Sequence, residues 1–274
     1  MDKVIILGTY GFVGYSICMK LLEEGLEVEG YRLDQGESEE FIESKKLMIG
    51  RNSNFKECLL EEDFLSMEPK QDLVILISYY DLFHTVSEKE LLNHPFLKLN
   101  IEQSLRKLPN VKIVCLFPNE FMNSIPSPFQ KQILSLEKEH VPFQSIFLPT
   151  IYGPWQPETF LFQQYFLKIG NVDNLQIDER ECTTDALYID DVVESLIAFI
   201  ISKKTSKIVL QNEDPNMWLK CAEYLTLQSF YRFDQKNSIL NQEDCQVVKV
   251  KGSISYKEAL EHQKSQSKLI ASLY

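Results

Sequence analysis

The sequence lacks the cysteine spacing that zinc sites and disulfide frameworks require. Its six cysteines are scattered along 274 residues, and no two of them form a Cys-x-x-Cys pair. Cys18 and Cys115 lie inside apolar runs, where a thiol usually behaves as a small hydrophobic side chain. We therefore expect reduced thiols, no metal site and a cytoplasmic protein.

Basic residues are also scarce. The chain has 28 Lys and Arg against 40 Asp and Glu, which gives a formal net charge of −12. A nucleic-acid-binding protein needs a basic face to neutralise phosphates, so this composition argues against nucleic acid as a partner. It does not exclude an anionic cofactor, because backbone N–H groups at the start of a helix bind phosphate without any lysine.

Long apolar runs are absent as well. The longest candidate, Val192–Ile201, is interrupted by Glu194 and is far shorter than the roughly 20 residues that cross a membrane. The first residues, MDKVIILG, have neither the basic region nor the small-residue cleavage site of a signal peptide. We expect no membrane partner.

The sequence does contain an alternation of strand and helix patterns. Apolar runs predict buried strands at Lys3–Leu7, Leu26–Leu33, Asp72–Ser78, Val111–Phe117, Phe143–Leu148 and Ile208–Leu210. Helical spacing predicts helices at Val13–Glu24, Leu92–Leu108, Phe160–Ile169, Asp190–Ile201 and Ser255–Leu273. Such alternation predicts an α/β fold, a Rossmann-type doubly wound parallel sheet with a small C-terminal substrate-side lobe. We expect an NAD(P)-binding Rossmann domain over residues 1–150, and the remaining Rossmann elements with the lobe over 151–274.

A glycine-rich loop joins the first predicted strand to the first predicted helix. In such a loop the first glycine permits a tight turn, the second lets the backbone approach a pyrophosphate, and the third lets helix and strand pack together. The positive end of the helix then faces the phosphates. The sequence therefore predicts a dinucleotide site, although a tight turn that no longer binds a ligand is the alternative. Its expected binding residues are Gly8, Tyr10, Gly11, Phe12, Val13 and Gly14.

Several motifs in order resemble the extended short-chain dehydrogenase/reductases, the family that includes NAD-dependent sugar-nucleotide epimerases and dehydratases. The glycine loop is similar to the family's GxxGFxG. The segment Pro149-Thr150-Ile151-Tyr152-Gly153-Pro154 resembles the end of its RPxNVYGP segment, and Tyr188-Ile189-Asp190-Asp191-Val192 resembles fVxVDDva. The resemblance covers about Met1 to Ile201.

The resemblance implies further residues at the cofactor. Asp63 falls in a segment similar to the loop whose aspartate contacts the adenine, and Ser78 ends the segment that resembles the fourth strand. Tyr79 and Tyr80 follow that strand, where a ring could pack against the cofactor or close the pocket.

The choice between NAD and NADP depends on the end of the second predicted strand. NAD-preferring members usually have an acid there, which accepts hydrogen bonds from the ribose hydroxyls. Arg32 stands at this place, and an arginine suits a 2′-phosphate. We expect Arg32 to bind the cofactor and favour NADP slightly over NAD; the alternative is that Arg32 only lies on the surface.

The resemblance fails at the catalytic residues. In the family a tyrosine and a lysine four residues later share one helix face, and the lysine lowers the tyrosine pKa for proton transfer. The equivalent segment has Phe129 in the tyrosine's place and Ile133 in the lysine's. None of the twelve tyrosines has a lysine four residues later, and the arginine of RPxNVYGP falls on Phe147. The catalytic residues are therefore unknown.

Three functions remain open. The favoured one is an NAD(P)-binding protein without standard redox catalysis, which senses the cofactor or serves as a partner subunit. The second is an active epimerase or reductase on a nucleotide-linked sugar with an unusual proton donor. The third is an accessory protein whose cofactor site is empty. A homodimer is expected by analogy, because dimerisation is common in the family.

Overall fold

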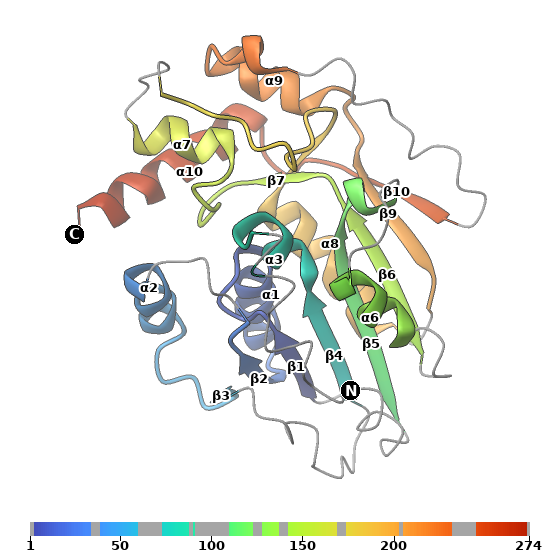
Figure 1. The fold of residues 1–274 in the computed structure, drawn as a ribbon. Coiled ribbons are helices and arrows are strands. Elements are labelled where there is room, and N and C mark those ends of the chain that lie inside the picture. The colour runs from blue at the N-terminus through green and yellow to red at the C-terminus, as the bar shows by residue number, and fades with distance from the viewer. Residues whose placement is uncertain are drawn as a thin grey trace.

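The central feature of the computed structural model is one parallel sheet with strand order β10-β9-β6-β5-β4-β1-β2-β3 (Figure 1). The structure describes residues 3–33, 39–59, 73–87, 90, 110–122, 128–136, 142–168, 174–202, 205–231 and 245–272. The sheet strands are β1 (Lys3–Leu7), β2 (Glu27–Tyr31), β3 (Phe55–Cys58), β4 (Leu73–Ser78), β5 (Val111–Pro118), β6 (Phe143–Leu148), β9 (Lys207–Asn212) and β10 (Cys245–Val250). A separate parallel pair joins β7 (Thr150–Tyr152) to β8 (Ala186–Tyr188).

The strand order reverses between β1 and β4. From β1 the sheet continues through β2 and β3 in one direction, and from β4 through β5 and β6 in the other. This is the doubly wound arrangement that the alternating sequence pattern predicts, so the expected Rossmann-type fold is confirmed. The carboxyl ends of β1 and β4 lie side by side at the reversal, with Leu7 opposite Ile77.

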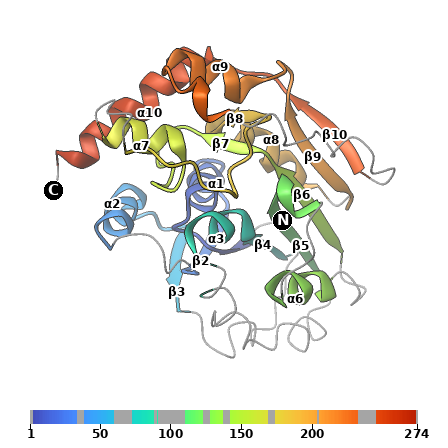
Figure 2. The same ribbon diagram turned by 45° about the horizontal axis from the view of Figure 1, so that its top comes forward.

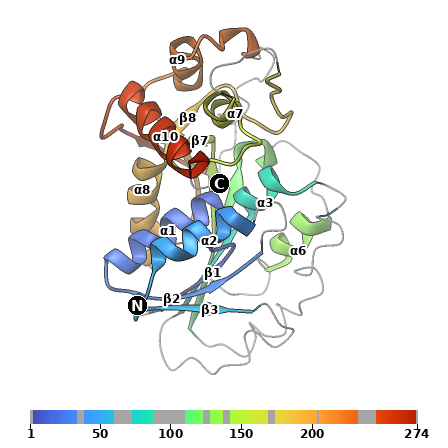
Figure 3. The same ribbon diagram turned by 90° about the vertical axis from the view of Figure 1, so that its left-hand side faces the viewer.

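Helices cover both faces of this sheet (Figure 3). One face carries α1 (Phe12–Glu23), α2 (Glu39–Ile49) and α8 (Ile189–Ile201), and α1 packs against α8. The other face carries α6 (Pro128–Leu136). Alternate residues of each strand enter the two cores: Leu116 packs on the α1 side, and Phe117 on the α6 side.

The remaining helices lie near the carboxyl ends of the strands. Directly after β4 comes α3 (Tyr79–Thr85), whereas α7 (Leu161–Leu167), α9 (Met217–Tyr224) and α10 (Tyr256–Ala271) gather at one end of the molecule (Figures 1 and 2). Two short 3-10 turns, η2 (Asn119–Met122) and η3 (Gln228–Phe230), follow β5 and α9. The helix bundle at this end corresponds in place to the expected lobe, while β9 and β10 return to the main sheet; the division at residue 150 stays a prediction.

The first βα unit shows why the sequence folds this way. The predicted helix over Val13–Glu24 is α1, shifted by one residue, and it ends before Gly25, whose φ of +79° terminates the helix. Ile17 and Leu21 on its inner face are completely buried. The helix predicted at Leu92–Leu108 lies outside the described residues. Within the described part of the chain, no helix has the length and apolar character to cross a membrane.

Candidate functional site

The candidate site is the crevice at the carboxyl ends of β1 and β4. Doubly wound sheets bind ligands at this point, where the strand order reverses. The glycine loop leaves the end of β1, and Ser78 with α3 follows at the end of β4. The structure therefore brings the predicted glycine loop and the predicted residue Ser78 together.

The glycine loop has the tight backbone that its sequence predicts. Gly8 has a φ of +95° and donates its N–H to the Tyr31 carbonyl oxygen at 2.9 Å, while Gly11 donates back to Gly8 at 3.1 Å. A β-carbon on Gly14 would collide with the Gly8 carbonyl oxygen, which is the close helix–strand packing expected of the third glycine. Helix α1 then begins at Phe12.

A carboxylate from α3 occupies the start of α1. Asp81 Oδ1 accepts the backbone N–H of Val13 at 2.9 Å, and Oδ2 accepts that of Gly14 at 2.9 Å. Ser78 donates its hydroxyl to Oδ2 at 2.6 Å. Only 4% of Asp81 is exposed. The second and third amides of the helix are thus satisfied by a residue that is far away in the sequence.

The Asp81 carboxylate also fills the space above Gly11. A β-carbon built on Gly11 would lie 2.5 Å from Asp81 Oδ2. Burial raises the pKa of Asp81, while the hydrogen bonds from Ser78, Val13 and Gly14 act in the opposite direction. The missing side chain of Gly11 leaves a space beside the backbone, and the Asp81 carboxylate fills this space.

On its other side the loop is held by α2. Lys45 is fully buried and donates from Nζ to the Tyr10 carbonyl oxygen at 2.5 Å. Its ammonium lies 5.1 Å from the ring centre of Phe41, 5.6 Å from that of Tyr15 and 5.8 Å from that of Trp155. The Tyr10 ring is itself completely buried, so the loop is fixed from both sides.

Arg32 points its guanidinium at a neighbouring carboxylate. Its two terminal nitrogens bind the Glu39 oxygens at 2.7 and 3.1 Å in a bidentate pair. A 2′-phosphate would have to compete with Glu39 for this group. Asp63, the residue expected at the adenine, lies outside the described residues.

Aromatic rings gather at the carboxyl ends of β4, β5 and β6, next to this crevice. Tyr79 follows β4, Phe117 and Phe147 are paired near the ends of β5 and β6, and Phe121 lies in η2. The Phe117 ring stacks on Phe121 at 4.7 Å and on Phe147 at 5.6 Å, and Tyr79 lies 5.9 Å from Phe117. All four residues are at most 8% exposed. We call these four residues the aromatic cluster.

Comparison with solved structures identifies the fold. The UDP-glucuronic acid 4-epimerase of Bacillus cereus, in complex with UDP-glucuronic acid and NAD, is 18% identical with a TM-score of 0.69, over 99% of this chain and 100% of that one. The dTDP-glucose 4,6-dehydratase of Bacillus anthracis, in complex with NAD, is 12% identical with a TM-score of 0.67, over 98% and 97%. The UDP-glucose 4-epimerase of Thermotoga maritima is 14% identical with a TM-score of 0.64, over 99% and 100%.

This chain has the extended short-chain dehydrogenase/reductase fold. The resemblance read from the three sequence motifs is therefore confirmed at the level of the fold. Neither a protein-family model nor a curated protein matches the sequence.

The two residues that the sequence resemblance aligns with the family's tyrosine and lysine lie in α6. Phe129 and Ile133 both fall within α6, one turn apart. The Ile133 side chain is fully buried in the same apolar core as the aromatic cluster. An alkyl side chain in this setting supplies neither a proton nor a charge.

The crevice, as the structure shows it, does not fit the pyrophosphate of a dinucleotide. An anion at the start of α1 would need the amides of Val13 and Gly14, and Asp81 already holds both. Two phosphate charges brought against a buried carboxylate would repel it strongly. The pyrophosphate fits only after Asp81 has left the loop.

Two titratable residues lie near the crevice: Glu120, which the sequence interpretation missed, and Tyr80, which it named. Burial raises the pKa of Glu120, in η2, to about 7. Tyr80 is completely buried, and its hydroxyl accepts the backbone N–H of Ile151 at 2.9 Å. The sequence shows that Tyr80 follows β4, but no local pattern indicates its hydrogen bond to Ile151, in the segment that resembles RPxNVYGP.

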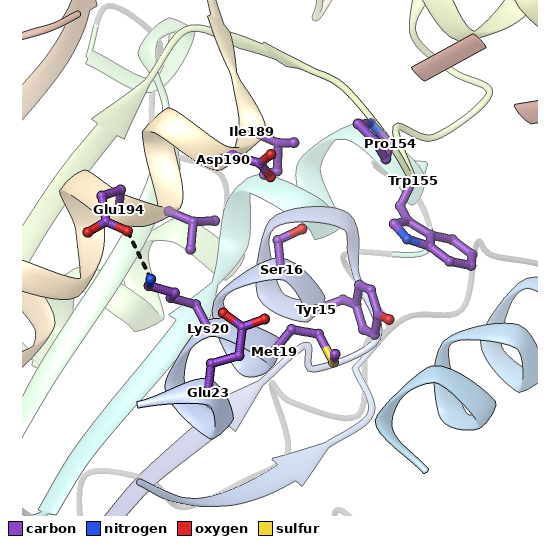
Figure 4. A pocket seen from close by; sticks show the side chains of 11 residues that line it. Tyr15, Ser16, Met19, Lys20, Glu23, Pro154, Trp155, Ile189, Asp190 and Glu194 are labelled. Atoms are coloured by element: carbon purple, nitrogen blue, oxygen red, sulfur yellow. Dashed lines mark ion pairs between the residues drawn. The ribbon is translucent and has the colours of Figure 1, made fainter. Parts of the chain in front are cut away.

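Two cavities lined by described residues lie away from the glycine loop. One of about 440 Å³ lies between α1 and α8, and Figure 4 shows the Lys20–Glu194 ion pair, 3.1 Å long, beside it. Another of about 710 Å³ lies between α7, α9 and α10. Neither is lined by Asp81 or by a loop glycine.

Proposed function

We propose that this chain carries out no hydride transfer and acts as a non-redox binding or accessory protein on the extended short-chain dehydrogenase/reductase fold. The aromatic cluster is the observation that supports this most strongly. It fills the carboxyl ends of β4, β5 and β6 with buried rings, next to the helix that would carry the catalytic pair. The rings of Phe117, Phe121 and Phe147 have no proton to exchange, and Ile133 brings no positive charge that could lower the pKa of the Tyr79 phenol.

A nicotinamide dinucleotide is the proposed ligand of the glycine loop. The B. cereus and B. anthracis structures contain NAD, and the loop has the turn and the close packing that the family's phosphate loop requires. The slight preference for NADP rests on Arg32 and requires Glu39 to give way. The binding role of Asp63, a nucleotide-linked sugar as a second ligand, a homodimer and a cytoplasmic location stay predictions.

A turnover assay tests the absence of redox catalysis. The purified chain is incubated with NAD or NADP and, in turn, UDP-glucose, UDP-glucuronic acid and dTDP-glucose. We expect no absorbance change at 340 nm and no new nucleotide sugar by chromatography. Turnover above that of a mock preparation would overturn the proposal in favour of an enzyme with an unusual proton donor.

A further inference from the structure

We propose that Asp81 is an internal anion that occupies the phosphate-binding end of α1, so that a dinucleotide binds only when this carboxylate leaves the loop. The inference rests on the proposed function, because it concerns the same crevice. It assigns to Asp81 the role of the residue that limits affinity for dinucleotides.

The hydrogen bonds of Asp81 reproduce those of a bound anion. One carboxylate oxygen takes the Val13 amide and the other takes the Gly14 amide, both at 2.9 Å. These are the second and third residues of α1, where the exposed N–H groups and the positive end of the helix dipole favour negative charge. Gly11 before them has no side chain that could cap the helix, so the cap comes from α3 instead.

The position of Asp81 also excludes a second anion. Its carboxylate lies directly against the α-carbon of Gly11, in the space where a side chain would be and where the loop should meet a pyrophosphate. The Ser78 hydroxyl, expected at the cofactor, is directed to the same carboxylate at 2.6 Å. Three predicted binding residues thus serve Asp81: Val13, Gly14 and Ser78.

The surrounding charge does little to relieve this repulsion. Lys45, from α2, is the cation whose charge favours ionised Asp81, but its ammonium is already directed to the Tyr10 carbonyl oxygen. The chain as a whole carries a formal charge of −12. A dinucleotide would therefore bring its charge to a site that already holds an anion, in a protein that is acidic overall.

Calorimetric titration of three proteins tests the inference. Wild type, Asp81→Ser and Asp214→Ser are titrated with NAD, NADP and inorganic pyrophosphate at constant ionic strength. Asp214 is an exposed acid that pairs with Lys220, so its replacement removes the same charge away from the loop. We expect Asp81→Ser to bind NAD and pyrophosphate at least tenfold more tightly than wild type, and Asp214→Ser to match wild type.

Each other outcome has a distinct meaning. If wild type binds NAD as tightly as Asp81→Ser does, the inference fails while the dinucleotide ligand stands. If neither protein binds any of the three compounds, the proposed ligand fails, and Asp81 is only a helix cap. Asp81→Ser also removes a cap from α1, so its fold is checked by circular dichroism. If it does not fold, Asp81→Asn replaces it. This variant removes the charge but fills the same space and can still accept the Val13 amide, so we expect a gain in affinity smaller than tenfold, and no gain would contradict the inference.

Discussion

At the scale of single residues, Ile133 is the position on which the proposed absence of redox catalysis depends. It stands where the resemblance places a lysine, yet its side chain is completely buried in an apolar core. A lysine introduced there would have no solvent and no acidic partner supplied by that core.

The first prediction concerns this position. We expect Ile133→Lys to lower the free energy of unfolding by more than about 2 kcal/mol, because it buries an ammonium among apolar side chains. Ile133→Leu, a swap of equal volume, should cost less than about 1.5 kcal/mol. Urea unfolding followed by circular dichroism measures both. A lysine variant as stable as the leucine variant would show that the position opens to solvent, as an enzyme's lysine must.

The second prediction concerns Glu120. Burial raises its pKa to about 7 from an ordinary value near 4.5, so folding favours the protonated carboxyl. The stability that this provides is complete below about pH 4.5 and is lost as the pH rises through about 7. We expect wild type to become less stable relative to Glu120→Gln between pH 5 and 8. Urea unfolding across this range measures the difference in free energy of unfolding between the two proteins. A difference that does not change with pH would contradict the burial of an ionisable carboxyl.

The glycine loop could be predicted from the sequence, whereas the role of Asp81 could not. The three glycines lie within seven residues, and the backbone demands of a βα turn give them a recognisable spacing. Asp81 meets Val13 across 68 residues, through the neighbouring positions of β1 and β4 in the sheet. Nothing in the local pattern after β4 distinguishes it from a solvated aspartate.

At the scale of elements, burial decided which strands could be predicted. Both β1 and β4 lie in the middle of the sheet with helices on each face, so they read as continuous apolar runs. In contrast β3, with the sequence FKEC, lies at the sheet edge and is mostly exposed. The strand β7 falls in a segment rich in proline and glycine, and only its pairing with β8 makes it a strand.

The burial of α2 could not be predicted from its sequence either. Its charged sequence suggests a solvated face between Glu37 and Lys46, yet Ile42 and Lys45 are completely buried against the loop. The buried ammonium is stabilised by the Tyr10 carbonyl oxygen and by the rings of Tyr15 and Trp155, which come from other parts of the chain. The third ring, Phe41, lies one turn earlier on α2 itself. Such a setting depends on tertiary contacts that no local pattern contains.

The third prediction is for the aromatic cluster as a unit. Phe117 is fully buried between Phe121 and Phe147, so Phe117→Ala should lower the free energy of unfolding by about 3–5 kcal/mol. Leu47→Ala, at a residue that is 80% exposed, serves as the control and should change it by less than about 0.5 kcal/mol. Thermal and urea unfolding measure both. If Phe117→Ala lowers the free energy of unfolding no more than Leu47→Ala does, the rings do not form a packed core. The carboxyl ends of β4, β5 and β6 could then open for a substrate.

At the scale of the whole molecule, the described residues have the fold of the solved epimerases and dehydratases, and two features occupy the carboxyl edge of its sheet. The parallel sheet, its reversal between β1 and β4 and the tight glycine loop are all present. The crevice at that reversal is closed by Asp81, and the neighbouring edge is filled by the aromatic cluster. These two features follow neighbouring strands of the sheet, β4, β5 and β6.

Isotope transfer tests the central claim most directly. The wild-type protein is incubated with NAD or NADP and UDP-glucose deuterated at C4 of the sugar, and the mixture is analysed by chromatography and mass spectrometry for deuterium on the nicotinamide and for the deuterated C4 epimer of the sugar. Our account predicts neither above the level in a mock preparation, at any protein concentration. Deuterium on the nicotinamide, or a deuterated C4 epimer that accumulates in proportion to the protein, would contradict it, because hydride would then be moving through a crevice that we describe as closed.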